Sequence, residues 1–126
     1  MIHAVHLLLY STGAEADRAF FRDVLGWSFV DAGHGWLIFA LPPTELGVHP
    51  ADSDSAPAPA HERLAAATVY LMCDDLAAEV HSLAAKGVPC TPSQDAGWGI
   101  TTTFRLPSGT TIGLYQPRHP LAIRTA

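Results

Sequence analysis

Three side chains in the first half of the sequence could together bind a divalent metal. His6 lies in a β-rich segment near the start, and Glu45 and His49 lie close together in a second short segment. Two histidines and one carboxylate are a ligand set used by non-haem iron and other divalent metals. A metal with open coordination positions would polarise a bound oxygen. The interpretation that we favour is a neutral pocket histidine at His6, with Glu45 and His49 near a strand end in water.

A second possible chemistry needs no metal. A histidine near its ordinary pKa transfers protons at neutral pH, so His6 could act together with Tyr10, Tyr70 or Tyr115. The same tyrosines, with an apolar body and a polar tip, serve equally well as pocket walls. No nucleophile elbow, phosphate-binding loop or pair of catalytic carboxylates is visible. If the chain is an enzyme, these residues therefore indicate His6, and no other side chain, as the catalytic group.

A third possibility is a protein that binds a ligand without transforming it. Side chains alternate along predicted strands, and one resulting face is mostly apolar and aromatic with a few polar groups, as small-molecule sites are. The members of this face are His6, Leu8, Tyr10, His49, Tyr70, Met72, Thr111 and Tyr115, with Trp36 and Trp98 as further candidates. The aromatic residues also suit plain core filling. Trp98 stands between Gly97 and Gly99, where a turn that needs glycine is an equally good explanation.

Composition narrows the classes of partner. Of the 126 residues 48% are hydrophobic and only 15% are charged, so some surface is expected to be hidden in a homodimer. The formal net charge of -5, with Lys86 as the single lysine, argues against nucleic acid. Cys73 and Cys90 lack disulfide or metal spacing, which favours reduced thiols in a cytoplasmic protein. The apolar runs are too short to span a membrane, and the start does not read as a signal peptide.

The elements that must position these residues begin with a strand and a helix. Thr12 followed by Glu15 predicts a capping box at the helix start, and Gly26 suits the left-handed position that ends a helix. The buried stripe of this helix is predicted to consist of Phe20, Phe21, Val24 and Leu25. Strands are predicted over 2–10, 27–30, 36–41 and 45–49.

The second half repeats this order after a small, polar, proline-bearing linker at 51–66. Asp74 or Asp75 is predicted to cap a second helix, which Gly87 ends. The apolar stripe of that helix is Leu76, Val80, Leu83 and Ala84. Strands are predicted over 68–72, 88–91, 100–106 and 110–115. We therefore predict an α+β fold in which two βαβββ units, 1–50 and 67–118, form curled mixed sheets around a small-molecule pocket.

The sequence resembles the vicinal oxygen chelate superfamily, which includes glyoxalase I, extradiol dioxygenases, and the fosfomycin and bleomycin resistance proteins. The resemblance rests on AFFRDVLGW at 19–27 in the first unit, and on CDDL at 73–76 and LPSGTTIGLY at 106–115 in the second. It implies one domain over residues 1–126, usually a homodimer or fused pair, whose curled sheets cup a small molecule.

In the metal-binding members of that superfamily, ligands come from the first and last strands of each unit. His6 matches the first-strand ligand, and Glu45 or His49 stands near the last-strand position of the same unit. Thr68 and Gly113 occupy the places of the second unit's histidine and glutamate, and neither is a good ligand. We therefore predict a small-molecule-binding protein with a degraded metal site and no cofactor. The alternative is a lyase, transferase or dioxygenase that uses Fe, Zn, Ni or Mn at His6 and His49, and a pure interaction protein ranks last.

Overall fold

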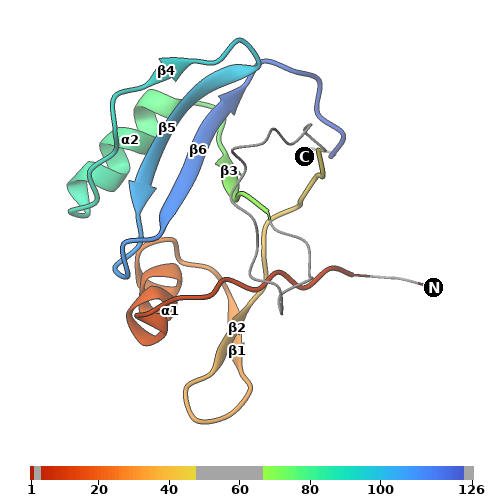
Figure 1. Cartoon of the computed structure of the whole chain (residues 1–126), viewed down its shortest axis with the longest axis vertical. Coiled ribbons are helices and arrows are strands. Elements are labelled where there is room, and N and C mark those ends of the chain that lie inside the picture. The colour runs from red at the N-terminus through yellow and green to blue at the C-terminus, as the bar shows by residue number, and fades with distance from the viewer. Residues whose placement is uncertain (2–3, 48–66, 124–126) are drawn as a thin grey trace, which may run out of the picture.

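The computed structural model describes residues 1, 4–47 and 67–123 of the chain. The predicted linker at 51–66 and His49 lie outside these residues. Within them the elements follow the order α1-β1-β2-β3-α2-β4-β5-β6 (Figure 1). The predicted α+β class, with two helices and mixed sheets, is confirmed.

Helix α1 (Ala14–Asp23) begins in a different way from the one predicted. Its N-cap residue makes no side-chain cap, so the expected capping box is not formed. The Ser11 hydroxyl instead accepts a hydrogen bond from the Gly13 N–H at 3.0 Å and donates to Asp17 at 2.6 Å. The prediction was wrong because an earlier hydroxyl already serves this end of the helix. Gly26 adopts the expected left-handed conformation beyond the helix, with φ of 70°.

The rest of the first half forms fewer strands than predicted. β1 (Phe29–Asp31) and β2 (Leu37–Phe39) make an antiparallel hairpin in which Val30 faces Ile38. Residues 4–10 and 45–47 form no strand, and every side chain from 4 to 10 is exposed. Alternating apolar residues show that a segment can form a strand. A strand also needs a neighbouring edge to take its N–H and C=O groups, and the described part of the chain provides none for residues 4–10.

The predicted βαβββ unit is present in the second half. Its elements are β3 (Tyr70–Met72), α2 (Leu76–Ala85), β4 (Gln94–Asp95), β5 (Gly99–Arg105) and β6 (Thr111–Pro117). The four strands form one sheet in the order β3-β6-β5-β4, with β3 parallel to β6 and the other pairs antiparallel. The strand predicted at 88–91 is absent, because Pro89 within the segment and Pro92 directly after it lack N–H donors. Only Thr91 pairs with β5, through its N–H and the Thr103 carbonyl at 2.9 Å.

Helix α2 is capped as predicted and lies against one face of this sheet (Figure 1). The Asp75 carboxylate accepts a hydrogen bond from the Ala78 N–H at 3.1 Å. Leu76 and Leu83 of the predicted stripe are buried, whereas Ala84 is exposed. The Leu76 N–H also donates to the Gln116 side chain at 3.0 Å, which ties the start of α2 to β6.

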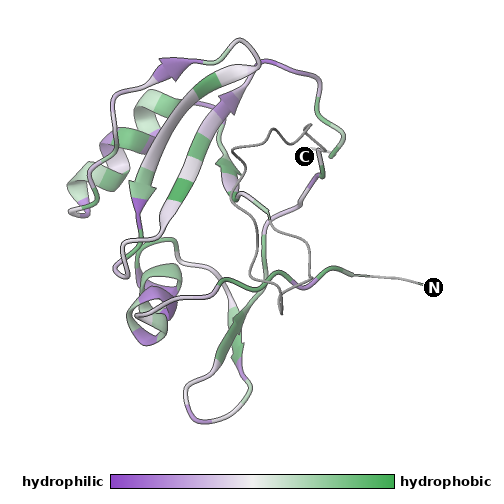
Figure 2. Cartoon of the chain, in the orientation of Figure 1, coloured by the Kyte–Doolittle hydropathy of each residue, from purple (hydrophilic) through white to green (hydrophobic). Residues whose placement is uncertain are grey.

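The hydrophobic core lies between the helices and the sheet. Figure 2 shows hydrophobic and more polar residues alternating along β5 and β6, as expected when only one face of a sheet is buried in the core. The buried cluster consists of Phe20, Leu76, Leu83, Val88, Phe104, Leu106, Ile112 and Leu114. Helix α1 joins it through Phe20, whose ring stacks on Phe104 at 5.9 Å. Buried Asp17 accepts hydrogen bonds from the Ser108 N–H at 2.9 Å and its hydroxyl at 2.7 Å, so α1 is fastened to the β5–β6 turn.

Candidate functional site

The sheet face opposite the core carries the second-half residues of the predicted ligand face. Ile112 and Leu114 belong to the core cluster, so alternation places Thr111, Gly113 and Tyr115 on the other face of β6. The strand register sets Tyr70 beside Gly113 and Met72 beside Tyr115. The structure therefore brings Tyr70, Met72, Thr111 and Tyr115 to one face.

Three aromatic rings meet on this face and form what we call the aromatic corner: Tyr70, Trp98 and Tyr115. Trp98 comes from the turn before β5 and lies 5.7 Å from Tyr70 and 5.1 Å from Tyr115 between ring centroids. Tyr70 and Tyr115 are also 5.7 Å apart, and the three interplanar angles are between 73° and 87°. Such edge-to-face pairs each add about 0.5–1.5 kcal/mol beyond their buried area. Tyr115 is 8% exposed, while Tyr70 and Trp98 are each 44% exposed, so the corner is held firmly and still faces solvent.

Two glycines make room for these rings. A Cβ atom at Gly113 would lie 2.2 Å from Cδ1 of Tyr70 and 2.4 Å from its Cε1. A Cβ atom at Gly99 would lie 2.9 Å from Cδ2 of Tyr115 and 2.8 Å from the Gln116 carbonyl oxygen. The rings therefore occupy the space that side chains at 99 and 113 would need.

His119 adds a polar group to the corner. Its Nε2 lies 3.1 Å from the Tyr115 hydroxyl and its Nδ1 lies 2.8 Å from the Pro120 carbonyl oxygen. A carbonyl only accepts, so Nδ1 carries a hydrogen, and in the neutral imidazole Nε2 accepts the hydrogen of the Tyr115 hydroxyl. Sequence reasoning missed His119 because it lies in a tail without periodicity. The only available signal was its position four residues after Tyr115.

Glu45 lies beside the corner and is held by the chain after β6. Its Oε2 accepts hydrogen bonds from the backbone N–H groups of Ala122 at 2.8 Å and Ile123 at 3.3 Å. Burial raises the pKa of the Tyr115 phenol, and the Glu45 carboxylate raises it further. Negative potential therefore reaches the corner from this side.

The described residues do not fit the metal site that the family resemblance implies. Glycine at 113 offers no ligand atom, and the Tyr70 ring fills the space where a side chain would project. Thr68 and His6 are both exposed, and Glu45 is engaged with backbone N–H groups. In the described ranges no three His, Cys, Asp or Glu side chains come together in a way that could hold a metal ion. His49, the remaining predicted ligand, lies outside those ranges.

The other predicted site residues lie elsewhere. His6, Leu8 and Tyr10 lie in the exposed segment at 4–10, and no hydrogen bond or aromatic contact joins them to the corner among the described residues. Trp36 lies next to the β1–β2 hairpin, where the Arg18 guanidinium sits 5.4 Å from its ring centroid. The structure thus assembles the second-half candidates and leaves His6, Leu8, Tyr10 and Trp36 apart from them.

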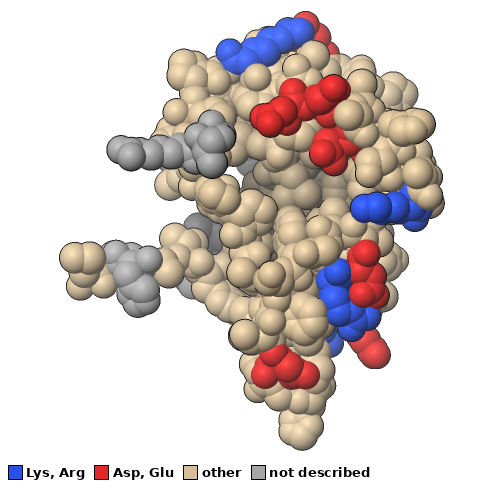
Figure 3. All heavy atoms as spheres, turned by 180° about the vertical axis from the view of Figure 1, so that it is seen from behind, with Lys and Arg blue, Asp and Glu red and all other residues tan. Residues whose placement is uncertain are grey.

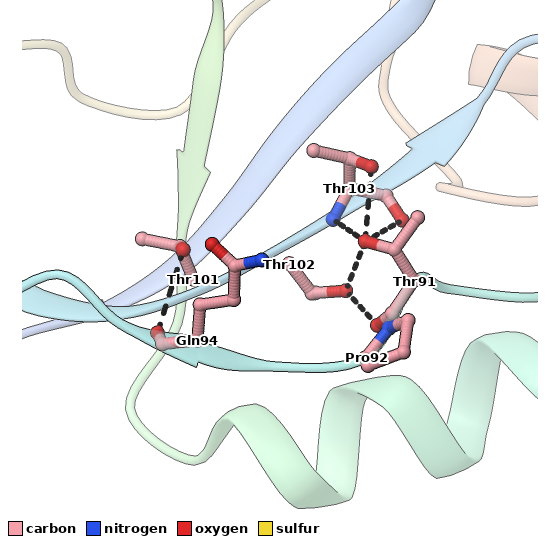
Figure 4. A pocket seen from close by; sticks show the side chains of 6 residues that line it. All are labelled: Thr91, Pro92, Gln94, Thr101, Thr102 and Thr103. Atoms are coloured by element: carbon pink, nitrogen blue, oxygen red, sulfur yellow. Dashed lines mark hydrogen bonds between the residues drawn. The ribbon is translucent and has the colours of Figure 1, made fainter.

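Two surface hollows lie in other parts of the molecule. One, of about 310 Å³, lies at the β4–β5 edge and is lined by threonines (Figure 4). The Thr91 hydroxyl there bonds those of Thr102 at 3.2 Å and Thr103 at 3.1 Å, so the polar groups satisfy one another. A second, of about 360 Å³, lies between α1 and the hairpin, where Arg18 and Arg22 line it together with acidic side chains.

Charged groups are sparse and mixed in sign. Figure 3, seen from the side opposite to Figure 1, shows a surface mostly without charge, with lysine and arginine in separate places. The exposed Arg118 guanidinium lies 2.6 Å from Asp95, and this contact is the main cause that lowers the pKa of that carboxyl. No basic patch is visible on this side, as the composition predicts. Neither helix in the described ranges is long and apolar enough to cross a membrane.

Comparison with known proteins extends these observations. Residues 3–114 match the model of the Glyoxalase/Bleomycin resistance protein/Dioxygenase superfamily. The structure is similar to that of TnmS3, an antibiotic binding protein from Streptomyces sp. CB03234, with 26% identity, a TM-score of 0.62, and 92% of this chain and 97% of that one covered. No curated protein sequence matches the chain.

Two more distant structures show the same fold. A lactoylglutathione lyase from Agrobacterium tumefaciens is 21% identical, with a TM-score of 0.56 over 90% of this chain and 92% of that one. A glyoxylase/bleomycin resistance protein/dioxygenase domain from Frankia sp. EAN1pec is 14% identical, with a TM-score of 0.56 over 94% and 99%. The family model spans most of the sequence and the fold agrees, so this chain belongs to the Glyoxalase/Bleomycin resistance protein/Dioxygenase superfamily.

Proposed function

We propose that this protein binds a small organic molecule at the aromatic corner, without a resident metal, and acts in the cytoplasm as a homodimer. The observation that carries the proposal is the position of the Tyr70 ring, which lies where a side chain at Gly113 would project. A half-exposed aromatic surface with a few polar groups suits the capture of a small molecule. The similarity to an antibiotic-binding protein supports the same conclusion.

The exposed residues of the first half support the homodimer. Val5 is 88% exposed, Leu8 60%, Tyr10 80% and Trp36 60%. Large apolar side chains exposed in this number favour an interaction site, and segment 4–10 has the composition of a strand that still needs an edge. A second copy of the chain is the partner that the low charge content predicts.

The metal-dependent lyase, transferase or dioxygenase remains the competing function, and one experiment separates the two. Freshly purified protein is analysed for metals, and thermal unfolding is recorded with added Fe, Zn, Ni or Mn and with a panel of small organic molecules. We expect no stoichiometric metal and no metal-induced shift, together with stabilisation by at least one compound. A ligand at one hundred times its Kd adds about 2.7 kcal/mol to the free energy of unfolding. A stoichiometric ion that is lost in His6→Ala would overturn the proposal.

A further inference from the structure

We propose that the group seated on the aromatic corner is an organic cation, such as a quaternised or protonated nitrogen heterocycle. This inference rests on the proposed function and adds the charge of the ligand to it. It draws on two separate observations, the arrangement of the rings and the charges that surround them.

The rings provide surface of the kind that attracts positive charge. Tyr70 and Trp98 stand at 87° to one another, and each is 44% exposed. The Tyr115 ring lies on the inner side of the corner, edge-to-face with both other rings. The face of each ring carries the negative part of its quadrupole, so a cation that touches two such rings is attracted by both. Tyr70 and Trp98 thus offer a ligand two differently oriented rings at once.

The fixed charge next to the corner is acidic. The backbone N–H groups of Ala122 and Ile123 hold Glu45 there, at 2.8 and 3.3 Å from its Oε2, and its carboxylate adds to burial in raising the pKa of the Tyr115 phenol.

The arginine nearest in the chain to this site is already paired. Arg118 donates its backbone N–H to the Trp98 carbonyl at 2.9 Å, and its guanidinium lies 2.6 Å from Asp95. That pair leaves little net charge at this end of the corner. A cation would be attracted by the Glu45 carboxylate and the rings together, whereas a neutral ligand would not.

The test compares two probes of the same size. 1-Methylquinolinium is a permanent cation, and 4-methylquinoline is its neutral counterpart at pH 8. Binding is measured by calorimetry and by the shift of the Trp98 indole N–H resonance. We expect the cation to bind about fivefold more tightly than the neutral probe, with the preference reduced by added salt.

Matched variants locate the effect. We expect Trp98→Leu to abolish binding of both probes and Glu45→Gln to remove most of the preference for the cation. Phe29→Leu, which changes an exposed aromatic residue of the β1–β2 hairpin, should leave both affinities unchanged. Far-ultraviolet circular dichroism checks that each variant is folded.

The outcomes distinguish this inference from the proposed function. If the neutral probe binds as tightly as the cation, and Trp98→Leu abolishes both, the corner is a ligand site but the inferred charge is wrong. If neither probe binds, and no compound of the wider panel shifts the Trp98 resonance, both the inference and the proposed function are wrong.

Discussion

Replacing Gly113 with alanine tests whether the Tyr70 ring really occupies the side-chain space of β6. Within a strand this replacement ordinarily stabilises a protein by about 0.5–1 kcal/mol, because glycine loses more chain entropy on folding. Here the new methyl group would lie 2.2 Å from Cδ1 of Tyr70, which no real contact allows. The ring must therefore leave its place, and the substitution should destabilise the protein.

The magnitude follows from what the displaced ring loses. Tyr70 makes edge-to-face contacts with Trp98 and Tyr115, which together are worth about 1–3 kcal/mol. Because Tyr70 is 44% exposed, its ring can turn into solvent without opening the core. After subtracting the entropic gain of alanine, we expect a net loss of about 1.5 kcal/mol. For a chain of this length that lowers Tm by about 5 °C.

A double-mutant cycle shows whether the ring is the cause. Urea denaturation gives the free energy of unfolding of wild type, Gly113→Ala, Tyr70→Ala and the double variant. Once the ring is removed, Gly113→Ala should become neutral or stabilising by about 0.5 kcal/mol, so the coupling energy is about 2 kcal/mol. Gly47→Ala is the control, since nothing lies within 4 Å of a Cβ atom there. Equal effects of Gly113→Ala in both backgrounds would refute the placement of Tyr70.

Three further predictions concern other parts of the molecule. In urea denaturation, Asp17→Ala should lower the free energy of unfolding by about 3 kcal/mol, because it leaves the Ser108 N–H without its acceptor. Glu15→Ala should change that free energy by less than about 0.5 kcal/mol, since no capping box forms. Burial, and to a smaller extent nearby carboxylates, raises the pKa of the Cys73 thiol to about 11. In a Cys90→Ser background, alkylation of Cys73 by iodoacetamide should therefore accelerate about tenfold per pH unit from pH 8 to 10. A plateau of the rate below pH 9 would contradict this. Light scattering should give a mass of twice 13.4 kDa for wild type and for the surface control Ala77→Asp. Leu8→Asp should give a smaller mass. An unchanged mass in Leu8→Asp would exclude segment 4–10 from the interface.

The sequence was most informative where local chemistry determines the structure. The cap of α2, predicted at Asp74 or Asp75, is made by Asp75, and Gly87 adopts the predicted left-handed conformation; both depend on neighbours within a few residues. Alternation along β6 likewise placed Tyr115 opposite Leu114. The capping-box prediction was wrong because the local pattern could not show that the Ser11 hydroxyl bonds to a residue six positions on, at the start of the helix.

The features that could not be predicted depend on distant partners. Segment 4–10 has the pattern of a central strand, but no pattern within a strand identifies the edge with which it pairs. The Tyr115–His119 contact and the backbone hydrogen bonds to Glu45 involve the irregular chain after β6, whose path has no periodic signal. The sequence identified the residues of the corner by type and face, and only the structure shows how they touch.

Glycine at 113 and tyrosine at 70 are best understood as a pair. The register puts them side by side on parallel strands, and the space above Gly113 holds either a side chain from β6 or the ring from β3. A glutamate there would need the volume that Tyr70 now fills, so a metal ligand at this position and the aromatic corner exclude one another. The position of the expected last-strand ligand and the proposed ligand site therefore lie on the same pair of strands, β3 and β6.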